Sequence, residues 1–101
     1  NIQVHEDIFT YIIQIVQGTR KHPYIELGLS SRASLAMLQA SKAHAFINGR
    51  EYVTPDDVKN IIDPVCLHRL RLSSQGMLIH EISSIMAELI KEIEAPVEAS
   101  I

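Results

Sequence analysis

The sequence predicts a small all-α domain, a bundle of four helices with very short extended segments between them. Apolar residues recur every three or four positions in four separate windows, which is the spacing that lines one face of a helix. The links between these windows are short and carry glycine, proline, serine and asparagine. A chain of 101 residues, 47% of them apolar, suits a single hydrophobic core. We therefore expect one domain.

The first predicted helix covers Glu6 to Gln17. Its apolar residues form one broad helical face: Ile8, Phe9, Ile12, Ile13, Ile15 and Val16. Gly18 is expected to stop this helix. The stretch from Thr19 to Pro23 is expected to be a connector, because a proline disfavours helix at the residue before it. Residues 24–27 then fit a short extended segment.

The second predicted helix begins at Ser30 or Ser31, whose hydroxyl can accept hydrogen bonds from the free N–H groups of a first helical turn. Its apolar and small residues continue at helical spacing: Leu35, Ala36, Leu38, Ala40, Ala43 and Ile47. Asn48 and Gly49 are expected to end it, because both residues tolerate a left-handed backbone. The alanines would let a neighbouring helix come close.

The third predicted helix has the clearest start signal in the sequence. Thr54 can cap the helix, and Pro55 suits the first helical position. The Asp56–Asp57 pair then places two carboxylates at the positive end of the helix dipole. The helix buries Val58, Ile61 and Ile62 and is expected to end or break near Pro64.

Two further segments complete the predicted domain. Alternating residues over Arg69–Ser73 fit an extended segment. The last helix carries apolar residues at helical steps: Leu78, Ile82, Ile85, Met86, Leu89, Ile90 and Ile93. Pro96 prevents much continuation, so the helical domain is assigned to residues 1–94 and a C-terminal tail to residues 95–101.

Composition and charge narrow the class of function. The net charge is −3, which does not supply the basic face that nucleic-acid binding requires. No apolar run approaches the roughly 20 residues needed to cross a bilayer, and no signal peptide is visible. Cys66 is the single cysteine, so a reducing, cytoplasmic setting is expected, with the thiol as a small buried side chain. The chain starts at Asn1 without a methionine and is expected to be a fragment of a larger protein.

Motifs of catalysis and metal binding are missing from the sequence. It contains no glycine-rich phosphate loop, no nucleophile elbow and no His-Glu-x-x-His pair. The five histidines are never three or four residues apart, so no helix face presents two of them to a metal. The Asp56–Asp57 pair is better explained by the helix dipole than by catalysis. We therefore expect no catalytic residue and no metal site within this chain.

Arg32 does not fit a purely structural role. Its cation falls within the first turn of the second predicted helix, where the positive end of the dipole disfavours it. A bound anion would remove this conflict, because backbone N–H groups and a guanidinium both bind phosphate oxygens. An exposed arginine can also bend into solvent at little cost, so position alone leaves both explanations open.

Four stretches of the sequence carry a family signal in matching order. They are Thr19–Pro23, Leu27–Ala36, Gly49–Val58 and Leu67–Leu70. Together they resemble the C-terminal lid of MoxR-type AAA+ ATPases over nearly the whole chain. In that family the second stretch usually has the sequence Gly-Ala-Ser-Pro-Arg-Ala. This chain differs from it at Leu29 and Ser31 and retains the arginine, as Arg32. The resemblance implies that Arg32 is the sensor-2 arginine, which reaches a bound ATP near its γ-phosphate.

The resemblance also implies a larger assembly. The parent would be a chaperone-like ATPase that forms a homo-oligomeric ring and acts on protein complexes as its clients. Its P-loop core, outside this chain, would bind ATP and Mg, and the lid alone would bind neither and not be catalytic. No nucleic acid or membrane partner is implied. Arg50, Arg69 and Arg71 could contact a neighbouring subunit, but solvated or intradomain roles are favoured, and Arg20 is undecided.

Two other functions stay open. A DNA-binding module of the helix-turn-helix or histone type is one, because Thr54–Val58 also suits the start of a histone helix. Charge argues against it, since the candidate helices contain only Arg32 with Lys42, or Lys59 alone. A protein-docking adaptor is the other, and it would expose an apolar groove.

Overall fold

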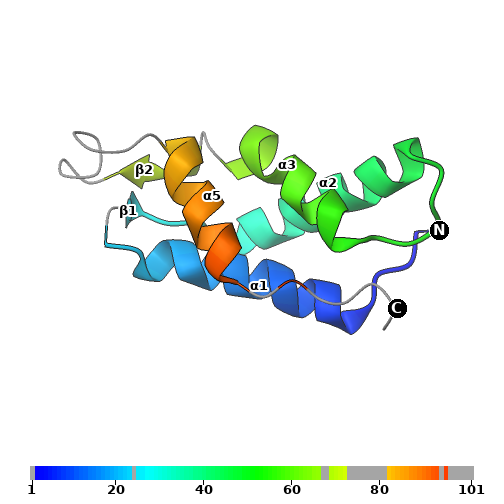
Figure 1. Cartoon of the computed structure of the whole chain (residues 1–101), viewed down its shortest axis with the longest axis horizontal. Helices are drawn as coiled ribbons and strands as arrows, with labels where there is room; N and C mark the ends of the chain where they lie inside the picture. The colour runs from blue at the N-terminus through cyan, green and yellow to red at the C-terminus, as the bar shows by residue number, and fades with distance from the viewer. Residues whose placement is uncertain (1, 24, 67–68, 73–81, 94, 96–101) are drawn as a thin grey trace.

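The computed structural model describes residues 2–23, 25–66, 69–72, 82–93 and 95. Within these residues four helices surround one core: α1 (Glu6–Lys21), α2 (Ser31–Ile47), α3 (Pro55–Cys66) and α5 (Ile82–Glu92). Two short strands, β1 (Ile25–Leu27) and β2 (Arg71–Leu72), pair antiparallel at one end of the molecule (Figure 1). The predicted all-α bundle with short extended segments is confirmed.

α1 contacts each of the other three helices. The most extensive contact between helices is that of α2 with α3. α1 runs along the long axis of the molecule, and α5 packs across α1 (Figure 1). The N-terminal segment adds a bridge that no sequence pattern predicted. Gln3 pairs with Tyr52 in parallel, the Gln3 N–H donating to the Glu51 carbonyl at 2.7 Å and the Val53 N–H to the Gln3 carbonyl at 3.0 Å.

The predicted end of the first helix at Gly18 is wrong, because α1 continues to Lys21. Gly18 lies inside the helix, at a position where a Cβ would come within 2.8 Å of the Leu89 Cδ1 of α5. The glycine therefore allows α5 to approach. The helix ends instead at His22, which is extended with φ −75° and ψ 132°, as expected for the residue before Pro23.

The predicted boundaries of the second and third helices agree with the structure, and α5 ends at Glu92, one residue before the predicted Ile93. α2 follows Ser30 and ends before Gly49, whose φ of 77° is left-handed. The predicted serine cap is wrong, since Ser30 makes no side-chain capping hydrogen bond. α3 starts at Pro55 and ends at Cys66, shortly after Pro64. Residues 78–81 of the predicted last helix, and all of the predicted tail except Ala95, lie outside the described residues.

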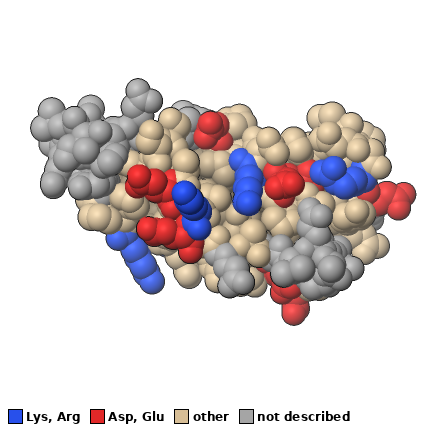
Figure 2. Space-filling view, in the orientation of Figure 1, with Lys and Arg blue, Asp and Glu red and all other residues tan. Residues whose placement is uncertain are grey.

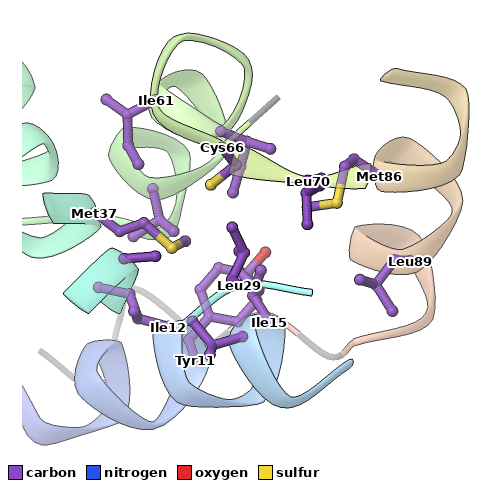
Figure 3. Close-up of a cluster of buried hydrophobic side chains, with 14 of the residues drawn as sticks. Tyr11, Ile12, Ile15, Leu29, Met37, Ile61, Cys66, Leu70, Met86 and Leu89 are labelled. Carbon is purple, nitrogen blue, oxygen red and sulfur yellow. The ribbon is translucent and has the colours of Figure 1, made fainter. Parts of the chain in front are cut away.

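The core is built from aliphatic side chains with few rings, as the composition predicts. Figure 3 shows Tyr11, Ile12 and Ile15 of α1 facing residues of α2, α3 and α5 in one cluster. Cys66 belongs to this cluster with none of its surface exposed, and burial raises the pKa of its thiol to about 11. It is the small buried side chain that was expected. No helix in the described part of the chain is both long enough and apolar enough to span a membrane.

Candidate functional site

Arg32 lies at the second position of α2, and its side chain is exposed. Within the described residues its guanidinium has no hydrogen bond or ion pair. α1 and α3 each carry two acidic residues in their first turn, whereas α2 carries none there and has Arg32 instead. The N-terminal turn of α2 therefore concentrates positive charge without an acidic partner of its own.

The segment before α2 is fixed to the last turn of α1 through Leu29. The Thr19 hydroxyl accepts a hydrogen bond from the Leu29 N–H at 2.9 Å and donates one to the Val16 carbonyl at 2.7 Å. The Arg20 Nε donates to the Leu29 carbonyl at 2.9 Å. Leu29 itself is 1% exposed and lies in the core cluster (Figure 3). We call these two hydrogen bonds, between the backbone of Leu29 and the side chains of Thr19 and Arg20, the α1–Leu29 contact.

Gly28 permits this close approach. A Cβ at Gly28 would lie 2.9 Å from the Cα and the N of Arg20 and 3.0 Å from the carbonyl carbon of Thr19. These are backbone atoms of a helix, so they cannot turn aside as a side chain can. A side chain at this position would push the segment away from α1. The stretch that the sequence marks only as a connector thus holds the start of α2 in place.

A buried carboxylate joins three segments near the other end of α2. Asp57 is 0% exposed, and its Oδ2 accepts hydrogen bonds from the Thr54 N–H at 2.7 Å and the Thr54 hydroxyl at 3.1 Å. Its Oδ1 accepts from the Nδ1 of His44, in α2, at 2.6 Å. The guanidinium of Arg50, in the segment between α2 and α3, contacts the same oxygen.

The ionised form of Asp57 is the one that these partners favour. Burial by itself raises the pKa of Asp57, but hydrogen bonds from the Thr54 N–H, from His44 and from the Thr54 hydroxyl, with the Arg50 charge, together hold this pKa below its ordinary value of 3.8. The interpretation of Asp57 as a dipole partner alone is therefore incomplete. The Thr54-x-x-Asp57 spacing of a capping box was the available signal. The sequence favoured a solvated or intradomain role for Arg50 without indicating its partner, and nothing in the sequence indicated His44.

The three arginines predicted as subunit-interface candidates lie in different settings. Arg50 binds Asp57 within the domain, so its intradomain role is observed. Arg69 is exposed and donates from Nε to the Val65 carbonyl at 2.9 Å. Arg71 lies in β2. Arg32 lies in the first turn of the 17-residue helix α2 and Arg50 lies beyond its last residue, so roughly 25 Å separates them along the helix.

Charges of both signs are interspersed on the surface. Figure 2 shows Lys and Arg side chains next to Asp and Glu side chains across the displayed face, with no continuous basic area among the described residues there. The net charge of −3 fits this pattern. This face therefore does not provide the positive potential that binds a phosphate backbone.

Comparisons with known proteins place these features in a family. Residues 17–89 match the model of the AAA lid domain. The chain is 34% identical to YeaC of Bacillus subtilis strain 168, over 99% of this chain and 32% of YeaC. It is 36% identical to the chaperone MoxR1 of Mycobacterium tuberculosis, over 73% of this chain and 22% of MoxR1. The crystal structure of a proposed ATPase from Cytophaga hutchinsonii superposes with a TM-score of 0.86 and 25% identity, over 95% of this chain and 32% of that one.

The chain spans about a third or less of the length of each of these relatives. The family match includes the end of α1, the α1–Leu29 contact, Arg32 and the Asp57 cluster, and it covers most of the chain. Sequence motifs, helical architecture and comparisons thus agree. The chain belongs to the AAA lid domain family and is the C-terminal lid of a MoxR-type AAA+ ATPase.

Proposed function

We propose that this lid senses the nucleotide held by a P-loop ATPase core, and that Arg32 is its sensor-2 arginine. One observation supports this most directly: an exposed guanidinium without a partner among the described residues, at the start of a helix that has no acidic residue in its first turn. A phosphate oxygen is the kind of acceptor that such a cation and the adjacent backbone N–H groups would bind.

The residues fit a phosphate group without rearrangement of the core, because Arg32 is exposed. Arg32 would donate hydrogen bonds to the γ-phosphate of ATP and lose them after hydrolysis. A charge-assisted hydrogen bond contributes about 1.5–3 kcal/mol. That difference would bias the lid between two orientations, since a ligand shifts a conformational equilibrium by its differential binding. ATP and Mg would be bound by the core, and no residue of this chain is assigned to Mg.

The wider assembly follows the family and is part of the same proposal. The parent would form a homo-oligomeric ring, hydrolyse ATP in its P-loop core and act as a chaperone on client protein complexes in the cytoplasm. MoxR1, one of the relatives, is described as a chaperone. Exposed Arg69 remains a candidate for contact with a neighbouring subunit, and Arg71 remains one by prediction. The lid alone would not hydrolyse ATP.

Substitution of Arg32→Ala in the full-length ATPase tests the proposal. We expect ATP turnover to fall roughly tenfold or more, which corresponds to a loss of about 1.4 kcal/mol of transition-state stabilisation. Folding should be nearly unchanged, because the side chain is exposed. Lys42→Ala on the same helix is the matched control and should retain turnover. Unaltered turnover in the Arg32 variant would contradict the proposal.

A docking role for proteins is the second candidate, favoured by an open groove of about 650 Å³ between α3 and α5. Its lining includes the apolar residues Ile62, Met86 and Ile90 and the charged residues Lys59, Asp63 and Lys91. Ile90→Ser, at a partly exposed position, would then weaken the action of the parent on its client and leave ATP turnover unchanged. If the same result accompanied an inert Arg32→Ala variant, docking would be the better description of this chain.

A further inference from the structure

We infer that Thr19 and Arg20 are positioning residues for Arg32, because the α1–Leu29 contact determines where the N-terminus of α2 lies. The inference rests on the proposed function of Arg32. Both polar groups of the Leu29 backbone are bound by side chains of α1, at 2.9 Å each. Only Ser30 and Ser31 separate Leu29 from Arg32, so a displacement of Leu29 would carry the arginine with it.

The start of α2 differs from the starts of α1 and α3 in how it is held. At α1, the N-cap His5 accepts a hydrogen bond from the Asp7 N–H at 3.1 Å. At α3, Thr54 and Asp57 form reciprocal capping contacts. Ser30, the N-cap of α2, makes no such side-chain hydrogen bond. Of these three helix starts, that of α2 is therefore the one held from outside, by α1.

This arrangement suits a site that binds an anion. A side-chain cap would occupy the backbone N–H groups of the first turn, which are the groups that a phosphate oxygen would also use. The α1–Leu29 contact fixes the position of the helix start through the residue before the N-cap. Among the described residues no side chain accepts from the N–H groups of this turn, in which the Ala33 N–H donates to the Ser30 carbonyl at 3.0 Å. Thr19 is 0% exposed and its hydroxyl both donates and accepts. It thus acts on Arg32 through the backbone and without touching the nucleotide.

The test uses the full-length ATPase with Thr19→Val, which removes the hydroxyl and keeps the volume of the side chain. We expect kcat to fall about tenfold, since misplacement of a contributing group by a fraction of an ångström to 1 Å lowers rates by this order or more. The ratio of the ADP to the ATP dissociation constant should fall as well, because Arg32 distinguishes the two nucleotides by the γ-phosphate. A general loss of stability would not change that ratio.

Matched variants separate positioning from folding. Thr19→Ser retains the hydroxyl and should restore both kcat and the nucleotide preference. Thr10→Val makes the same substitution at an exposed position of α1 and should change neither. Arg20→Met removes the hydrogen bond to the Leu29 carbonyl and should lower kcat and the nucleotide preference as Thr19→Val does. Because Arg20 is exposed, this variant keeps the test available if Thr19→Val folds poorly. Lys21→Met is the control for Arg20→Met and should be silent.

The double variant of Thr19→Val with Arg32→Ala distinguishes the two proposals. If Thr19 acts through Arg32, the double variant should have the same kcat as Arg32→Ala alone. If Arg32→Ala lowers kcat but Thr19→Val does not, or if their losses multiply in the double variant, the positioning role is overturned and the sensing role stands. If Arg32→Ala leaves turnover unchanged, both proposals fail.

Discussion

Asp57 shows how much a single side chain can determine in a domain of this size. Its carboxylate is fully buried and binds Thr54, His44 and Arg50, so it links the start of α3 to α2 and to the segment between them. A buried carboxylate is tolerated only with such partners, because an unpaired ion loses its hydration without compensation. The sequence places Asp57 in a first helical turn, but the fold alone brings His44 to it. The exposure of Arg32, in contrast, follows from its place at a helix start.

Replacing Asp57 with alanine should strongly destabilise the domain. The substitution leaves the Arg50 guanidinium and the Thr54 N–H without their acceptor, and breaking a buried pair in this way costs about 3–5 kcal/mol. Asp56→Ala is the matched control, because Asp56 is exposed in the same helical turn, where a dipole contact contributes about 0.3–1 kcal/mol. Chemical unfolding measures the loss of stability in both variants. Equal losses would show that the cluster contributes nothing beyond the helix dipole.

The stability of the domain should also depend on pH through Asp57. The pKa of this carboxyl is lower in the folded state than its ordinary value of 3.8. The contribution of the ionised Asp57 to the free energy of unfolding is therefore complete above about pH 4–5 and is lost as the pH falls through the folded-state pKa. We expect the Tm of the wild type to decrease more between pH 5 and about pH 2.5 than that of Asp57→Ala. A parallel decrease in both proteins would assign the acid sensitivity to other carboxylates.

At the scale of elements, two glycines show what local sequence signals predict and what they miss. Pro23, Gly49 and the Thr54-Pro55 start act through their own backbone, so the sequence predicts the helix ends that they make. Gly18 looks the same in sequence, but it lies where α5 crosses α1. Its role depends on tertiary packing and was not predictable. The pairing of β1 with β2 and the α1–Leu29 contact were missed for the same reason, since each depends on how separate segments pack and not on a pattern within one segment.

Alanine substitutions at Gly28 and Gly18 should differ in their effect on the free energy of unfolding. At Gly28 the new Cβ meets helix backbone at 2.9 Å, so Gly28→Ala should destabilise by about 1–3 kcal/mol. At Gly18 it meets only the end of the Leu89 side chain, which can move, and the gain of about 1 kcal/mol in helix propensity should offset the cost. Gly18→Ala in a Leu89→Ala background should then be stabilising. Denaturant unfolding of the three variants and of Leu89→Ala alone measures this. A larger loss for Gly18→Ala than for Gly28→Ala would contradict the packing described.

At the scale of the whole molecule, charge distinguishes the lid from a DNA-binding module. The chain carries a net charge of −3, and opposite charges are interspersed on the face that Figure 2 displays. We therefore expect no salt-dependent binding of random duplex DNA at micromolar protein, measured by fluorescence anisotropy at two salt concentrations. Binding that weakens steeply with salt would favour the DNA-binding alternative. The helical periodicity of apolar residues was sufficient to predict the fold class, and the family was recognised from four short sequence stretches that resemble the MoxR-type lid.

The two ends of α2 give that helix a mechanical property. One end follows the Leu29 backbone, which α1 holds, and the other carries His44, which the buried Asp57 holds. A helix anchored at both ends behaves as a stiff rod, since bending it would break buried contacts. A displacement of the end that bears Arg32 would therefore strain the contacts of Leu29 and of His44 together, because the helix between them does not bend. The far end of α2, where Phe46 and Gly49 line a pocket together with Ile2 of the N-terminal segment, lies roughly 25 Å from its first turn.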